Sequence, residues 1–218
     1  MKTPVRLLRA AVLGLAGLLA GCAMENVDYT AFRASRPASI LVLPPLNSTV
    51  EAGAEAAVLA QATLPLAESG YYVVPVAVMD ETFRQNGVYT AADAQSLPAA
   101  KLREIFGADA ALYLHVTRYG VSYSILFSSV AARIEATLVD LRTGATLWED
   151  RKSVSESNTD TSDGLAGMLV QAIVDQVVNT LSDSSYEVAG QAARKLLAAG
   201  RQGGLLHGPR SPQYELHP

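Results

Sequence analysis

The chain has 218 residues, half of them hydrophobic, and carries 17 basic and 21 acidic residues for a formal net charge of −4. This length and composition fit one globular domain with a sizeable core and argue against a disordered chain. The acidic balance offers no basic patch for nucleic acid, and the single cysteine, Cys22, excludes a disulfide framework within the chain.

The first 21 residues predict a lipoprotein signal peptide. Basic residues precede an apolar run over residues 10–20, which is too short to span a bilayer as a helix. The segment LAGC (residues 19–22) is typical of a bacterial lipobox, in which the cysteine thiol takes a diacylglycerol and becomes the new N-terminus. We therefore expect lipid attachment at Cys22. A plain signal peptide and a short membrane anchor are the alternatives.

The residue after Cys22 indicates which of the two membranes of the envelope holds the protein. Ala23 stands where an aspartate would favour the inner membrane, so we expect an outer-membrane anchor with the body in the periplasm. Acylation by several chains, palmitate among them, anchors stably, whereas a single chain binds only marginally. Cleavage before Cys22 leaves 197 residues with 14 basic and 21 acidic side chains, a net charge of −7.

The first half of the mature chain begins with a predicted lipidated tether over residues 22–38. A short buried strand over 39–47 ends at a proline pair, and an alanine-rich helix follows over 51–70, which Pro65 is expected to kink or end. A second strand is predicted over 71–76 and a second helix over 77–87.

The middle of the chain alternates a helix with strands. Pro98 opens a helix that Gly107 can cap, and residues 110–117 then form a strand with apolar residues on one side. Residues 130–138 alternate cleanly, with Arg133 and Glu135 on the polar side, and 140–150 form a turn and a return strand around Gly144.

A polar loop over 155–163 precedes two predicted helices, 164–181 and 185–200. The final residues, 201–218, form a Gly/Pro-rich C-terminal tail whose apolar side chains favour docking on the domain. The element order predicts an α/β domain over residues 39–200: a two-layer sandwich of a mixed sheet with a β-hairpin and helices packed mainly on one face.

Candidate catalytic and metal-binding residues are few. The three histidines lack the helical spacing of a zinc site, and Cys22 is used by the lipid, so neither a metal nor a cofactor is predicted. A hydrolytic set of Ser122 or Ser124 with His115 and Asp109 can be nominated, but neither serine lies in a nucleophile-elbow context. We therefore predict a protein that is not an enzyme and has no catalytic residues.

Residues 119–130 alternate apolar and small polar side chains, which predicts a strand. Its apolar side most simply faces the core. Alternatively, an edge strand presents Tyr119, Tyr123 and Phe127 to a partner by strand addition, so these three are the candidate partner-binding residues.

The chain also resembles a known family along nearly its whole mature length. The resemblance rests on the lipobox and on five segments: VLPPLNST (42–49), AESGYYVVPVAVMDETFRQNG (67–87), IFGADAALYLHV (105–116), LVDLRTGATLWE (138–149) and GLLHGPRSP (204–212). Together they resemble the Gram-negative outer-membrane lipoproteins typified by a neisserial surface antigen. The hairpin VDLRTGATLW is similar to one in the curli secretion channel subunit, in lipoprotein activators of penicillin-binding proteins and in the N-terminal domain of the Tol-system β-propeller protein.

The resemblance implies a related α/β fold, an outer-membrane lipoprotein and a place beside a curli-channel-like lipoprotein in an envelope complex. It supplies no catalytic residues. We expect a non-enzymatic accessory of an envelope export or surface-assembly complex, with a homo-oligomer as a further option. The alternative is a periplasmic small-ligand-binding component of a transporter.

Overall fold

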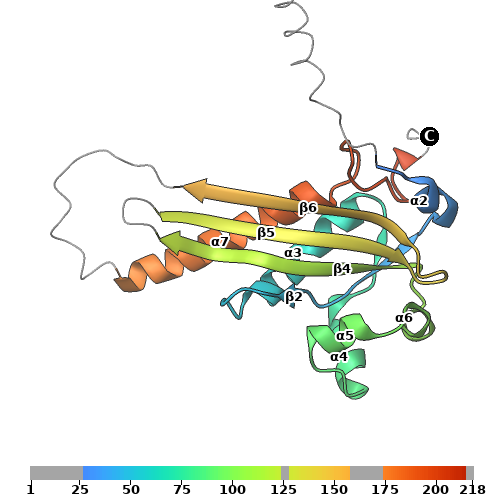
Figure 1. Ribbon diagram of the computed structural model, residues 1–218, viewed down its shortest axis with the longest axis horizontal. Helices are drawn as coiled ribbons and strands as arrows, with labels where there is room; N and C mark the ends of the chain where they lie inside the picture. The colour runs from blue at the N-terminus through green and yellow to red at the C-terminus, as the bar shows by residue number, and fades with distance from the viewer. Residues whose placement is uncertain (1–26, 124–127, 158–173, 215–218) are drawn as a thin grey trace, which may run out of the picture.

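Figure 1 shows the computed structural model of the chain, which describes residues 27–123, 128–157 and 174–214. Six strands form one sheet: β1 (Ser39–Val42), β2 (Leu46–Asn47), β3 (Tyr72–Val73), β4 (Ala110–Tyr123), β5 (Ser128–Asp140) and β6 (Thr146–Ser157). The helices are α2 (Thr30–Ser35), α3 (Ala54–Glu68), α4 (Val76–Gln85), α5 (Ala91–Ser96), α6 (Ala99–Phe106) and α7 (Val174–Leu197).

The sheet is mixed, in the order β3-β1-β4-β5-β6, and β2 pairs with β4 beyond the end of β1. β1, β2 and β3 join it through parallel pairings, whereas β4, β5 and β6 form an antiparallel meander. The long meander strands extend well beyond the short ones (Figure 1). The predicted α/β fold with a mixed sheet and a β-hairpin is confirmed.

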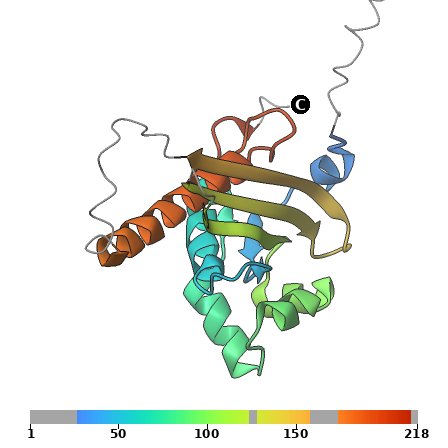
Figure 2. The same cartoon turned by 60° about the vertical axis from the view of Figure 1, so that its left-hand side comes forward.

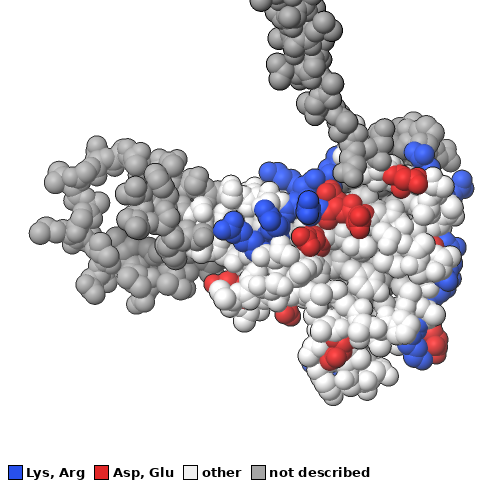
Figure 3. Space-filling view, viewed as in Figure 1, with Lys and Arg blue, Asp and Glu red and all other residues white. Residues whose placement is uncertain are grey.

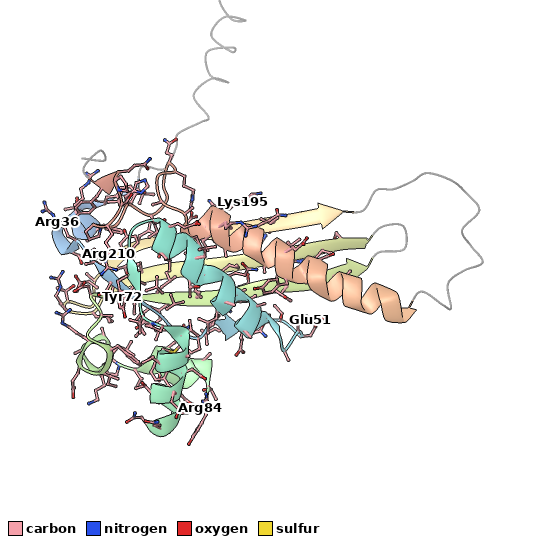
Figure 4. The ribbon with its side chains drawn as sticks, turned by 180° about the vertical axis from the view of Figure 1, so that it is seen from behind. Arg36, Glu51, Tyr72, Arg84, Lys195 and Arg210 are labelled. Atoms are coloured by element: carbon pink, nitrogen blue, oxygen red, sulfur yellow. The ribbon has the colours of Figure 1, made fainter. Side chains whose placement is uncertain are left out.

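The main hydrophobic core lies between one face of this sheet and helices α3 and α7, which lie behind it in Figure 2 and in front of it when the molecule is seen from behind (Figure 4). Alternate strand residues point into this layer, including Leu112, Leu114, Ile134 and Leu138, each at most 1% exposed. Most of the residues between them are polar, so the meander strands have a second, largely polar face, on which Ala111 and Ala131 are buried exceptions.

A smaller core lies on the other face, at one end of the sheet. Leu41 and Leu43 from the β1 segment meet Met79 and Phe83 of α4 and Leu102 of α6 there. These helices cover only the start of β4, so none of the described helices lies over this face along the remaining length of β4–β6 (Figure 1). The helices thus lie mainly on one face.

The β5–β6 hairpin forms as its sequence predicts. Gly144 adopts a φ of 74°, a conformation that costs other residues free energy. The buried Asp140 carboxylate accepts hydrogen bonds from the backbone N–H groups of Arg142 and Thr143, so it organises the turn. The Arg142 guanidinium also reaches this carboxylate, at 3.0 Å.

Four predicted elements differ from the structure. The strand expected over 39–47 is two short strands, β1 and β2, separated by the proline pair. Helix α3 continues through Pro65 to Glu68, because Pro65 and Leu66 are buried in the core and tertiary packing outweighs the missing hydrogen bond. The two helices expected at the C-terminal side are one helix, α7, from Val174 onward, while residues 164–173 lie outside the described part. The single strand expected over 119–130 is the end of β4 and the start of β5.

The segments flanking the expected domain are also folded where they are described. Within the stretch expected to be a tether, α2 buries Phe32 in the main core. The C-terminal tail docks on the body through Leu205, which is 1% exposed. Trp148 Nε1 donates to the carbonyl of Gly203 at 3.0 Å, and the Tyr71 hydroxyl donates to that of Leu206 at 2.6 Å. Among the described helices, none is long and apolar enough to cross a bilayer.

Candidate functional site

The candidate site is the uncovered face of the meander, here called the arginine face and defined by Arg118, Arg133, Arg151 and Glu135. All four side chains lie on the side of β4–β6 opposite the main core. The three arginines are exposed. Figure 3 views the molecule from the uncovered side and shows basic and acidic side chains gathered over the middle of the meander.

The strand register places Arg118 of β4 directly opposite Arg133 of β5. A register shift between Val116 and Arg118 makes this possible, because the extra residue Thr117 moves Arg118 to the outer face, whereas strict alternation would place it on the core side. Like charges directly opposite each other on a sheet are destabilising. Neither guanidinium has an ion pair or hydrogen bond with any residue that the structure describes, and the same holds for Arg151.

The sign of the side-chain charge changes along the strands of the arginine face. The row with Arg118 and Arg133 ends in Ser153 on β6, and the next row contains Glu135 opposite Arg151. One row further toward the β5–β6 turn, Thr137 stands opposite Glu149. The face is therefore basic toward the β4–β5 connection and acidic toward the turn.

A polar network joins this face to the loop after β2. Ser48 Oγ lies 2.7 Å from His115 Nε2, and His115 Nδ1 lies 3.8 Å from Glu135 Oε2. Ser48, His115 and Glu135 therefore follow one another in the order of a nucleophile, a base and an acid. The second distance exceeds hydrogen-bond reach, and the side chains of His115 and Glu135 are 37% and 43% exposed, unlike the enclosed sites that stabilise transition states. The arrangement is best described as a surface network.

The hydrolytic set nominated from the sequence is not brought together. His115 and Asp109 are separated by six residues of extended chain, on the order of 20 Å. Asp109 instead accepts hydrogen bonds from the backbone and side chain of Ser39 at 3.1 and 3.0 Å. The side chain of Ser122 and all of Ser124 lie outside the described part of the chain. Ser48, which does contact His115, was missed because only the parallel β2–β4 pairing brings it there.

The candidate partner-binding aromatics have different positions. Tyr119 lies on the helix-covered side of β4, half-buried against the main core. Burial first, and then the nearby Glu51 and Tyr186, raise the pKa of its hydroxyl. Tyr123 ends β4, opposite Ser128, and its side chain lies outside the described residues, as do all of Phe127 and Cys22.

The pairing of β4 is asymmetric near its end. β5 accompanies the strand to Tyr123, but β1 and β2 pair with it only as far as Val116. From Arg118 onward, no other strand within the described ranges pairs with its second edge.

Two grooves lie elsewhere on the surface. The larger, about 720 Å³, lies beside Val27 and Trp148 and contains a contact between Arg201 and the Asp150 carboxylate. Burial alone would raise the pKa of Asp150, but hydrogen bonds from Arg201, the Arg151 backbone and Lys152 lower it. A second groove of about 300 Å³ lies between α3, α4 and α5 beside Phe83. No group of side chains able to hold a metal ion occurs among the described residues.

Comparison with known proteins identifies relatives of the whole body. The family model "Putative lipoprotein GNA1162-like" matches residues 27–210. The chain is 46% identical over 204 residues to the lipoprotein NMB1124/NMB1162 of Neisseria meningitidis serogroup B, covering 91% of this chain and 95% of the relative.

Solved structures give the same result. The crystal structure of lipoprotein GNA1162 from Neisseria meningitidis shares 48% identity at a TM-score of 0.54, covering 66% of this chain and 99% of the other. A weaker likeness, with a TM-score of 0.40 and 14% identity, is to the PelC dodecamer of Paraburkholderia phytofirmans, over 73% of this chain and 87% of that one. The chain belongs to the GNA1162-like lipoprotein family.

Proposed function

We propose that this protein is a non-enzymatic lipoprotein, acylated at Cys22 in the outer membrane, whose arginine face binds a partner protein in the periplasm. The observation that carries the binding function is the cross-strand pair Arg118 and Arg133 on a sheet face that none of the described helices covers. An unpaired cationic row on a rigid sheet lowers stability, and a partner of complementary charge would compensate it.

The partner is an envelope protein. Membership of a lipoprotein family and the LAGC segment support membrane attachment, and the resemblance to envelope machines supports an accessory role in export or surface assembly. A curli-channel-like lipoprotein is the proposed partner. Partner binding through Tyr119, Tyr123 and Phe127 stays a separate prediction.

Attachment and binding are tested separately. Mass spectrometry of the mature N-terminal peptide should find acyl chains on Cys22, and fractionation should place the protein in the outer membrane. A photo-reactive residue at the exposed Ser153, beside Arg133, should form one reproducible cross-linked product in cells. The same residue at Gln85 on α4, which is also exposed, is the matched control and should not. Equal products from both positions, or none from Ser153, would overturn the binding proposal.

A further inference from the structure

We infer that the partner segment bound at the arginine face is acidic, with carboxylates that contact Arg118 and Arg133 together. This inference rests on the proposed function and specifies the chemistry of its partner. It depends on the arrangement of charge on the face rather than on the net charge of the chain, which is negative.

The geometry favours a carboxylate between the two arginines. Residues directly opposite in an antiparallel pair have Cβ atoms about 5 Å apart, so both guanidinium groups can reach one carboxylate or two adjacent ones. Guanidinium groups bind carboxylates through two parallel hydrogen bonds, which gives geometric specificity as well as attraction. No acidic side chain among the described residues occupies this position.

The neighbouring rows set the direction of the segment. Gly120 and Ala131 stand opposite each other on the side of the β4–β5 connection, where both are buried and the Glu51 side chain lies against Gly120. Glu149 lies toward the β5–β6 turn and would repel a further carboxylate. An extended acidic segment therefore binds with its carboxylates over Arg118 and Arg133 and with neutral or basic groups over Glu149.

The test uses the full chain and a synthetic glutamate-rich peptide as the probe, with the matching glutamine-rich peptide as its neutral counterpart. Arg118→Gln combined with Arg133→Gln should weaken binding of the acidic peptide about tenfold at low ionic strength. The control combines Arg84→Gln with Lys101→Gln, which removes two positive charges from exposed side chains on α4 and α6 and should leave the affinity unchanged. Both arginines of the test variant are exposed, and an unfolding curve confirms that the variant folds.

Three results would overturn the inference: equal binding by the test and control variants, equal binding of the neutral peptide, or arginine-dependent binding of phosphatidylglycerol vesicles without binding of the acidic peptide. The last result would make a phosphate-bearing surface the ligand. Cross-linking from Ser153 separates this failure from failure of the proposed function. A partner captured equally well by the Arg118→Gln/Arg133→Gln variant would leave the proposed function standing and reject the acidic segment.

Discussion

Ser35, which ends helix α2, donates its hydroxyl hydrogen bond to the carboxylate of Asp140, 105 residues further along the chain. The Arg142 guanidinium bridges the same two residues, at 2.7 Å from the Ser35 carbonyl oxygen and 3.0 Å from Asp140 Oδ2. Helix α2 is thus fixed to the β5–β6 turn at one end of the sheet.

Asp140 should make stability depend on acid. Burial would raise its pKa, but the hydrogen bonds from Arg142, Ser35 and two backbone N–H groups outweigh burial and hold the pKa well below its usual range. The carboxylate therefore stabilises the fold above its unfolded pKa of about 3.9, and this contribution is lost as the pH falls from there through the lower folded pKa. In urea unfolding at pH 7, Asp140→Asn should lower the free energy of unfolding by about 1–3 kcal/mol.

Urea unfolding repeated at a series of pH values tests whether Asp140 causes the acid sensitivity. The unfolded pKa of the carboxyl lies between about pH 5 and pH 3. Over this range the variant should lose less stability than the wild type. Asp80→Asn, at an exposed carboxylate on α4, should keep the wild-type pH dependence. A wild-type pH dependence in Asp140→Asn would show that Asp140 does not supply this acid sensitivity.

The C-terminal tail should contribute to stability through Leu205. Its side chain is 1% exposed in the main core, so Leu205→Ala should lower the free energy of unfolding by about 2–5 kcal/mol. Leu64→Ala is the same substitution at a side chain that is 58% exposed, and it should change stability by no more than about 0.5 kcal/mol. Equal effects in denaturant unfolding would contradict the docking of the tail.

The tail also approaches Gly70 closely. A Cβ there would overlap the backbone nitrogen of Ser211 and lie 2.8 Å from the carbonyl oxygen of Gly208. Gly70→Ala should therefore destabilise the fold more than Gly87→Ala, whose φ is also positive but whose Cβ would meet no atom within 4 Å. The difference should be about 1–3 kcal/mol, and trypsin should cut after Arg210 faster only in the first variant. Equal losses of stability would mean that backbone conformation alone accounts for both.

Arg133 should be a position at which stability and binding conflict. Arg133→Gln removes the like-charge pair with Arg118, so it should raise the free energy of unfolding by about 0.2–1 kcal/mol. The same variant should cross-link less to its partner from Ser153. Arg84→Gln, which breaks a 2.6 Å ion pair with Asp80, should instead leave cross-linking intact and not increase stability. A destabilised Arg133→Gln would show that the guanidinium already has a favourable contact.

Local patterns predicted the parts of the fold that depend on neighbouring residues. Alternation over 130–138 placed Arg133 and Glu135 on the polar face, and Gly144 marked the turn between β5 and β6. The short helix α5 was not predicted, although Thr90 caps it by accepting from the Asp93 N–H at 3.1 Å. Its six residues are too few to show a helical period.

Features that depend on distant residues could not be read from the sequence. The pairing of Arg118 with Arg133 requires the register shift after Val116, and the contact of Ser48 with His115 requires the β2–β4 pairing. The Gly/Pro-rich tail is ordered by backbone hydrogen bonds to the end of α3, where the Gly208 N–H donates to the Ser69 carbonyl at 2.8 Å. The sequence around either residue of such a contact gives no indication of the residue that it contacts.

The most direct test of partner binding at the arginine face is site-specific photo-cross-linking in cells from Ser153, comparing the wild type with the Arg118→Gln/Arg133→Gln variant and identifying the product from purified outer membranes. We predict a single product that contains another envelope protein, with a yield about tenfold lower in the variant. An equal yield in both proteins would reject the arginine pair as the contact, and the absence of any product from the wild type would contradict partner binding at this face.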